Sequence, residues 1–218
     1  MIKVIAEIGI NHNGSFNKAI KLIDAAKNSG CWGVKFQYRK DDFFSTNDEM
    51  GSTLIRAELK ESSFDIKWID KIINHCKKKD INLGMSFFRT EDLDYFFSKH
   101  PKIDFIKIPS PEFRNIELIN RAKKYSKKII ISYGAGNEKE IGNAIKKSNL
   151  RKNDCVMHCI SNYPTSTGEQ QMSFLKRLKE LSNCSTGYSS HDEDWEVLIT
   201  SFQYKIDYLE RHLCESKD

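Results

Sequence analysis

The sequence lacks the features that mark several common protein classes. Its six cysteines include no C-x-x-C pair, and no apolar run approaches the length of a membrane span. No signal-peptide cleavage site follows the apolar N-terminal residues MIKVIAEIGI. Basic residues are spread over helical segments without a dense stripe, although the formal net charge is +5. We therefore expect a cytoplasmic protein that binds neither membranes nor nucleic acid, and whose partners are small molecules.

Short β-rich runs alternate with amphipathic helical patterns along the chain. The predicted strands span residues 3–10, 33–37, 83–88, 105–110, 129–134, 155–161, 186–191 and 207–213. The predicted helices span residues 16–30, 64–79, 91–98, 115–126, 137–148, 171–181 and 194–204. Strand–helix–strand repeats of this kind build parallel sheets with right-handed crossovers. They predict an α/β fold in which residues 1–218 form a single (β/α)8 TIM barrel.

Three further observations refine this prediction. No G-x-G-x-x-G motif follows the first predicted strand, so an open dinucleotide-binding sheet has no support. The segment 38–63 is the longest insertion, and we expect a loop there that acts as a lid or binding element on the catalytic face. The chain stops six residues after His212, so we expect no helix after the eighth strand. We expect either that the given sequence is incomplete or that a partner covers the apolar surface that such a barrel leaves open.

Lysines occupy two strands that otherwise read as buried. Lys107 lies within FIKIPSPE and Lys35 lies within GVKFQ. A buried ammonium group needs an anion beside it or it loses its proton. Glu7 could supply that anion for Lys35. Two such lysines with serines beyond them also suit a larger anionic ligand that carries both a phosphate and a carboxylate.

Polar residues gather where the predicted strands end, and these ends share one rim in a barrel. Residues two apart on a strand face the same side of the sheet. Two polar residues with that spacing at the end of a strand can therefore both face one cavity. The rim set comprises Glu7, Asn11, His12, Asn13, Lys35, Gln37, Lys107, Ser110, Glu112, Ser132, His158, Ser161, Tyr163, Ser189, His191, Glu210 and His212.

Histidines in this set suggest two different roles. His191 and His212 end neighbouring strands near Glu112, which predicts a divalent metal site with open positions for substrate. His158 has no such companion, and we interpret it as mainly structural. A zinc site formed by Cys155, His158 and Cys159 is a weak alternative.

Seven segments together resemble a known family. AEIGINHNGSFNKAIKLIDAAKNSG, VKFQ, IKIPSPE, ISYG, HCISNYPT, GYSSH and ERH follow one another over essentially the whole chain. This series resembles the sialic acid (N-acetylneuraminate) synthase family of phosphoenolpyruvate-dependent nonulosonic acid synthases. The resemblance implies a transferase that condenses phosphoenolpyruvate with N-acetylmannosamine or a related aminosugar. The products would be sialic acid, or another nonulosonic acid, and phosphate.

The resemblance also implies roles for individual residues. Phosphoenolpyruvate would be held by Lys35, Lys107, Ser110, Ser132, Ser161 and Ser189. A manganese or magnesium ion would be bound by His191 and His212. Glu7 and Glu112 would lie near the sugar aldehyde and the metal-bound waters, and Gln37 and Tyr163 would line the sugar site. We expect catalysis to depend on Glu7, Lys35, Lys107 and Glu112.

The sequence departs from the family pattern at several positions. The usual S-T-P-F reads MSFF at residues 85–88, the usual S-T-G-M reads SYGA at 132–135, and the usual S-D-H reads SSH at 189–191. The segment after the second strand diverges too far from the family pattern to assign the family's asparagine ligand, and Asn47 lies nearby in the sequence. In the family, a small C-terminal antifreeze-like domain reaches into a partner's site, so the resemblance implies a homodimer. We expect that residues 1–218 do not include this domain.

These departures leave two alternatives open. One is another phosphoenolpyruvate-dependent aldol-type synthase that acts on a sugar phosphate, with Arg39, Lys40 and Arg89 as candidate phosphate ligands. The other is a non-catalytic barrel of the same family that serves as a binding module.

Overall fold

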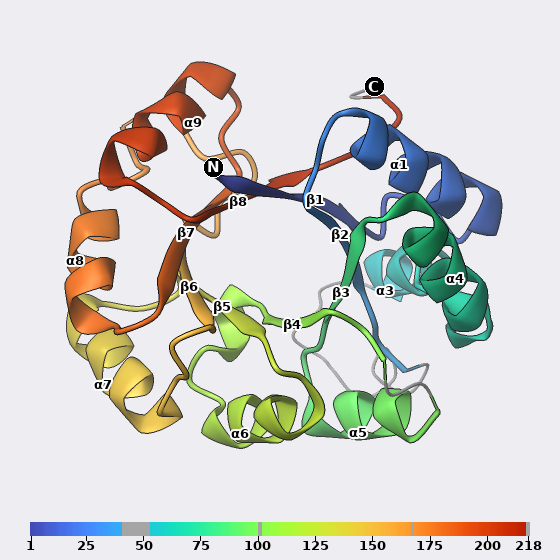
Figure 1. Ribbon diagram of the computed structural model, residues 1–218, viewed down its shortest axis with the longest axis horizontal. Helices are drawn as coiled ribbons and strands as arrows, with labels where there is room; N and C mark the ends of the chain where they lie inside the picture. The colour runs from blue at the N-terminus through green and yellow to red at the C-terminus, as the bar shows by residue number, and fades with distance from the viewer. Residues whose placement is uncertain (41–52, 100–101, 167, 217–218) are drawn as a thin grey trace.

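The chain folds into a closed barrel of eight parallel strands with helices around it (Figure 1). The computed structural model describes residues 1–40, 53–99, 102–166 and 168–216. The strands are β1 (Lys3–Gly9), β2 (Gly33–Gln37), β3 (Asn82–Ser86), β4 (Phe105–Ile108), β5 (Ile129–Tyr133), β6 (Cys155–His158), β7 (Ser185–Ser190) and β8 (Tyr208–His212). The α-helices are α1 (Phe16–Asn28), α3 (Thr53–Glu61), α4 (Ile69–Lys79), α5 (Thr90–Lys99), α6 (Ile116–Tyr125), α7 (Glu138–Ser148), α8 (Phe174–Leu181) and α9 (Trp195–Thr200). Short 3-10 helices are η2 (Ile66–Trp68), η3 (Ser110–Glu112) and η4 (Ser201–Tyr204).

The register of the strands determines which polar side chains become neighbours. Glu7 pairs with Lys35 across β1 and β2, and Glu7 also pairs with His212 where β8 closes the barrel. Ser189 pairs with Glu210 across β7 and β8. Since alternate residues of a strand face the interior, these pairs form one polar layer near the carboxyl ends of the strands.

Apolar and aromatic side chains fill the barrel below this layer. Phe105 and Tyr208 are buried there, and Trp32 packs against both rings at centroid distances of 5.4 Å. Gly84 makes room for this packing, because a β-carbon at that position would lie 2.2 Å from the Phe105 ring. The interior is thus a packed core that is polar only at its mouth.

The helices cover the outside of the barrel with their apolar faces. Asparagine side chains mark the starts of two of them: Asn115 caps α6, and Asn137 forms a capping box with Glu140 in α7. Within the described residues no helix follows β8, as expected, and the ring of helices is open between α9 and α1 (Figure 1). Over that same part of the chain, none of the helices combines the length and apolar composition that a membrane span requires.

The structure confirms the predicted barrel and corrects some element boundaries. β4 ends at Ile108, two residues early, because Pro109 has no N–H for the ladder and Ser110–Glu112 turn into η3. The predicted helix at 194–204 is divided into α9 and η4. The segment 38–63 is more than a loop, since it contains α3. Asn47 lies outside the described residues.

Candidate active site

Four buried charges form the centre of the polar layer. Lys35 Nζ lies 2.8 Å from Glu7 Oε2 and 3.5 Å from Glu210 Oε1. Lys107 Nζ lies 2.7 Å from the same Glu210 oxygen. The four side chains are at most 6% exposed, so each charge depends on the others for compensation. Two carboxylates thus balance the two buried ammonium groups of the strand lysines.

The pKa directions follow from this arrangement. Burial alone would raise the pKa of Glu210, but Lys107 and Lys35 outweigh it and hold that pKa far below its usual range. For Lys35, burial opposes the charge, and attraction by Glu210 and Glu7 nevertheless leaves its pKa raised. Burial lowers the pKa of Lys107, which has one close carboxylate and also faces repulsion from Lys35. Glu210 is therefore an anion at neutral pH.

The four charged side chains line a cavity of about 550 Å³ at the carboxyl ends of the strands. The cavity contains all but one of the residues predicted for the site. Its lining includes Glu7, Lys35, Gln37, Lys107, Ser110, Ser132, Ser161, Tyr163, Ser189, His191, Glu210 and His212. The exception is Glu112, which is not among the lining residues and accepts a hydrogen bond from Asn115 at 3.2 Å. Burial raises the pKa of Glu112.

Serine hydroxyls surround the lysines, and they differ in whether they have a hydrogen-bond partner. Ser189 Oγ donates to Glu210 at 3.1 Å, and Ser161 Oγ donates to Ser110 Oγ at 3.1 Å. Ser132 Oγ is buried and makes no hydrogen bond of normal geometry within the described part of the chain. A buried hydroxyl without a partner is costly, so Ser132 is suited to donate to a ligand in the cavity.

A hydrogen-bonded chain runs along one wall of the cavity. Arg39 Nη1 donates to Gln37 Oε1 at 3.0 Å, and Gln37 Nε2 donates to Glu7 Oε1 at 2.8 Å. These two partners fix the orientation of the Gln37 amide, because its oxygen must face the guanidinium group and its nitrogen must face the carboxylate. Glu7 thus joins Gln37 to the charged cluster.

Two histidines and a tyrosine lie at the mouth. The His191 and His212 rings are 5.8 Å apart, and the exposed Tyr163 ring packs on His191 at 4.0 Å. His191 Nδ1 lies 2.7 Å from the carbonyl oxygen of Ile160, which leaves Nε2 as the nitrogen able to face a ligand. Burial lowers the pKa of His191, so its ring is neutral at pH 7. A neutral imidazole is the form that binds metals.

The structure also settles the role of His158. Its Nε2 lies 2.6 Å from the carbonyl oxygen of Gln170, which supports the structural interpretation. The alternative zinc site is wrong: Cys155 packs inside the barrel, and His158, three residues along β6, faces the opposite side. Across residues 1–40, 53–99, 102–166 and 168–216, no group of three or more metal-ligating side chains is present.

A charged cavity where the strands of a (β/α)8 barrel end is the arrangement in which barrel enzymes carry their active sites. The NeuB family model matches residues 22–218, and the chain belongs to this family.

Relatives with established names agree with this assignment. The chain is 30% identical to the N,N'-diacetyllegionaminic acid synthase of Campylobacter jejuni over 99% of its own length and 68% of the relative's. It is 27% identical to the N-acetylneuraminate-9-phosphate synthase of Drosophila melanogaster, covering 99% of this chain and 61% of that one. The chain thus spans about two thirds of these relatives.

Solved structures share the fold. The N-acetylneuraminic acid synthetase of Leptospira borgpetersenii, solved with citrate, superposes with a TM-score of 0.87 at 24% identity, covering 99% of this chain and 74% of that one. Relatives at the sequence level are named as synthases of sialic, legionaminic or pseudaminic acid, which identifies the chain as a member of a family of nonulosonic acid synthases.

Proposed function

We propose that the chain condenses phosphoenolpyruvate with N-acetylmannosamine or a related N-acetylated aminosugar, releasing a nonulosonic acid and phosphate. The observation that carries this proposal is one cavity lined by two buried lysines and five serines, Ser86, Ser110, Ser132, Ser161 and Ser189. Family membership supports the reaction type.

The lysines and serines suit the anionic groups of phosphoenolpyruvate. Lys35 and Lys107 would attract its carboxylate and phosphate as point charges, in a site where burial strengthens electrostatic attraction. Serine hydroxyls rotate and can donate to the remaining oxygens, and Ser132 would gain the partner it lacks. Binding must compete with Glu7 and Glu210, which already neutralise the lysines.

The reaction balances with these groups in place. The methylene carbon of phosphoenolpyruvate attacks the sugar aldehyde and forms the new carbon–carbon bond. The aldehyde π bond breaks in this step, and its oxygen becomes an alkoxide. Water then adds to the resulting cationic centre, and the tetrahedral intermediate expels phosphate. Of the two protons of that water, one ends on the alkoxide oxygen as the new hydroxyl and the other ends on the released phosphate. Glu7 would accept the proton of that water, and the lysines would hold the anionic groups throughout. The Gln37 amide, fixed by Arg39 and Glu7, would orient a sugar hydroxyl.

His191 and His212 suit a divalent metal ion. Both line the same cavity, and the contact of His191 with Ile160 orients its ring in the way that second-sphere partners orient metal-binding histidines. Two histidines leave positions open for water and substrate. When bound, a manganese or magnesium ion would polarise the aldehyde oxygen as a Lewis acid.

Phosphate release tests the proposal. Phosphoenolpyruvate would be incubated with N-acetylmannosamine and manganese, with matched reactions that omit the sugar or contain a chelator. We expect release that requires both sugar and metal. Release without sugar would indicate a phosphatase. The absence of release from every N-acetylated aminosugar tried, with no protection against heat by phosphoenolpyruvate, would reject the proposal in favour of a non-catalytic barrel.

A further inference from the structure

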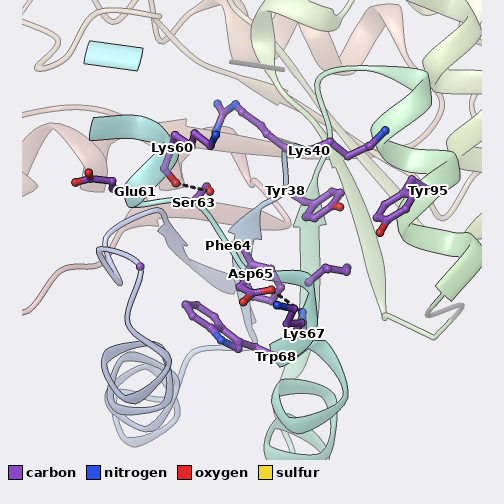
Figure 2. A pocket seen from close by; sticks show the side chains of 13 residues that line it. Tyr38, Lys40, Lys60, Glu61, Ser63, Phe64, Asp65, Lys67, Trp68 and Tyr95 are labelled. Atoms are coloured by element: carbon purple, nitrogen blue, oxygen red, sulfur yellow. Dashed lines mark hydrogen bonds between the residues drawn. The ribbon is translucent and has the colours of Figure 1, made fainter. Parts of the chain in front are cut away.

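Two sides of the barrel mouth are built differently. Beside the end of β2 lies a second cavity of about 670 Å³, whose described lining includes Phe64, Trp68 and Tyr95 (Figure 2). At the ends of β7 and β8, just before the two mouth histidines, polar side chains instead form a hydrogen-bonded network on the outer face of the sheet. The proposed reaction assigns no role to this network.

Strand alternation separates the network from the barrel-mouth cavity. Ser189 and Glu210 are paired in register across β7 and β8, and both line the cavity. The residues that follow them, Ser190 and Arg211, are also paired in register and therefore face outward. The next residue along each chain segment is a histidine that lines the cavity again. Each histidine is thus the direct neighbour of a residue in the outer network.

Arg211 ties the end of β7 to β8. Its Nη1 donates to Ser190 Oγ at 3.0 Å, and its Nη2 donates to the carbonyl oxygen of Asp192 at 2.9 Å. A longer contact joins Nη2 to the carbonyl oxygen of Glu193 at 3.4 Å. Because the guanidinium group is planar and its donors have fixed directions, these contacts hold residues 190–193 in place relative to β8.

Asp192 accepts hydrogen bonds from the hydroxyl groups of β7. Ser190 Oγ donates to Asp192 Oδ2 at 2.8 Å, and the Tyr188 hydroxyl lies 2.9 Å from Oδ1 and 2.8 Å from Oδ2. All three residues are at most 5% exposed. A buried carboxylate without such donors is costly, so these hydroxyls stabilise Asp192 in this position. The departure SSH at 189–191 thus leaves this segment with a carboxylate, supplied by Asp192.

The loop after β6 joins the same network. The backbone N–H of Thr165 donates to the carbonyl oxygen of His191 at 2.9 Å, and Thr165 also pairs with Asp192 in a single parallel bridge. The same loop supplies the Ile160 carbonyl oxygen that contacts His191 Nδ1. His191 is therefore held both at its backbone and at its ring, which gives Nε2 a fixed direction.

We propose that Asp192 and Arg211 are positioning residues that fix the spacing and orientation of His191 and His212 from outside the barrel, so that one divalent metal ion binds both. This inference rests on the proposed function, because it assumes that the two histidines hold the metal. Two ligands on separate strands bind an ion tightly only if their spacing is set beforehand, since otherwise binding must also order the strand ends.

Manganese binding to the protein alone tests this inference without catalysis. Electron paramagnetic resonance, which detects free manganese, measures the affinity. Asp192→Asn keeps the shape of the side chain but removes its charge, and Arg211→Gln removes the fork that ties β7 to β8. We expect each change to weaken manganese affinity by about 10-fold or more, the usual effect of removing a partner behind a metal ligand. Affinity for phosphoenolpyruvate, measured by calorimetric titration without metal, should stay near the wild-type value.

Asp94→Asn is the matched control. Asp94 also accepts a hydrogen bond from a tyrosine hydroxyl, that of Tyr125 at 3.0 Å, and it also has an arginine partner, Arg121 at 3.0 Å, but it lies in α5. Manganese affinity in this variant should equal that of the wild type. His191→Ala removes a proposed ligand directly, and we expect it to abolish manganese binding.

Milder variants keep the test decisive if Asp192→Asn or Arg211→Gln does not fold. Tyr188→Phe removes one donor to Asp192, and Ser190→Ala removes the hydroxyl that joins Asp192 to Arg211. Both should weaken manganese affinity in the same direction but by less, with phosphoenolpyruvate affinity again unchanged.

Three outcomes would overturn the inference. Wild-type manganese affinity in the Asp192 and Arg211 variants, together with loss in His191→Ala, would reject this inference alone. A parallel loss of manganese and phosphoenolpyruvate affinity would show that the network supports the whole mouth and not the histidines in particular. A wild type that binds no manganese, or binding that His191→Ala leaves unchanged, would reject the metal site of the proposed function itself.

Discussion

Lys107 lies in a barrel strand with its charge intact because Glu210 lies 2.7 Å away on a strand across the barrel mouth. The pair is buried on both sides, so neither charge is stabilised by water. Removing one partner of such a pair leaves an uncompensated charge in the interior, which costs far more than the pair contributes.

Lys107→Ala should therefore weaken the fold as well as phosphoenolpyruvate binding. We expect its free energy of unfolding to fall by about 3 kcal/mol or more, because among the described residues Glu210 then keeps Lys35, at 3.5 Å, as its ion-pair partner. Lys107→Met combined with Glu210→Gln removes both charges, and should recover most of that loss without restoring phosphoenolpyruvate binding. Urea denaturation and calorimetric titration measure the two quantities.

The same variants can contradict this explanation. A double variant as unstable as Lys107→Ala would mean that packing, rather than an unpaired charge, controls stability at this position. Unchanged phosphoenolpyruvate affinity in both variants would remove Lys107 from the anion site.

Contacts between individual residues could be predicted from the sequence where both partners lie on consecutive strands. Glu7 and Lys35 lie on consecutive strands, and the suggestion that they pair is confirmed at 2.8 Å. Glu210 was visible as a rim residue, but the partner of Lys107 depends on strand register around the closed barrel, across 103 positions of sequence. Glu112 was expected near the histidines, but it lies in η3 and is not among the residues that line the cavity.

Among the elements, the turn after β1 contains a histidine in an unusual setting. His12 is fully buried, and its ring packs against Phe36 of β2, Phe64 and Trp68 at centroid distances of 5.8, 6.1 and 5.6 Å. Neither ring nitrogen has a hydrogen-bond partner in the described residues. Burial lowers the pKa of His12 to about 4. This ring joins the β1 turn to β2 and to the start of α4 as a neutral, nearly apolar group.

His12 should make the stability of these elements depend on pH. The unfolded chain protonates His12 below its ordinary pKa of 6.5, while the folded protein resists protonation down to a pKa of about 4. Its contribution is thus present above pH 6.5 and is lost as the pH falls. Between about pH 7.5 and about pH 5, the wild type should lose about 2 kcal/mol more stability than His12→Leu.

Urea denaturation of both proteins at the two pH values measures this difference. The comparison with His12→Leu cancels other titrating groups such as His191. Parallel pH dependence in the two proteins would show that His12 is protonated as easily in the folded state as in the unfolded one.

The elements were predictable wherever their pattern was strong. All eight strands overlap the β-rich runs that predicted them, and the signal was strongest where a strand buried on both faces is continuously apolar, as in IIISY of β5. α3 was missed, since TLIRAELKE follows a polar stretch that masked its helical spacing. The observed ends of elements differed from the predicted ones where a residue such as Pro109 could not continue the strand.

At the scale of the whole molecule, the buried charges connect opposite sides of the barrel. Glu7, Lys35, Lys107 and Glu210 come from β1, β2, β4 and β8, and their formal charges sum to zero. A phosphoenolpyruvate molecule brought into this balanced cluster adds negative charge that the lysines must share with the carboxylates. The low pKa of Glu210 depends on those same lysines, so the ligand should raise it.

Phosphoenolpyruvate binding should therefore take up protons. A group whose pKa rises on binding is protonated more in the complex than in the empty protein, so affinity should increase as the pH falls from about 6 to about 4, the range that the carboxyl reaches when the ligand weakens its hold on the lysines. Calorimetric titration in buffers with different ionisation enthalpies measures the number of protons directly. Glu210→Gln cannot take up the proton, and we expect both the uptake and the pH dependence of affinity to shrink in this variant.

A buffer-independent enthalpy would require a different charge balance. In that case the lysines would hold the ligand without giving up Glu7 or Glu210, and the compensating positive charge would have to come from elsewhere in the cavity lining. Arg39 is placed to supply it, because it lines the same cavity and is joined through Gln37 to Glu7. Arg39→Gln would then weaken phosphoenolpyruvate binding even without an acceptor sugar, whereas proton uptake by Glu210 leaves that affinity nearly unchanged in the variant.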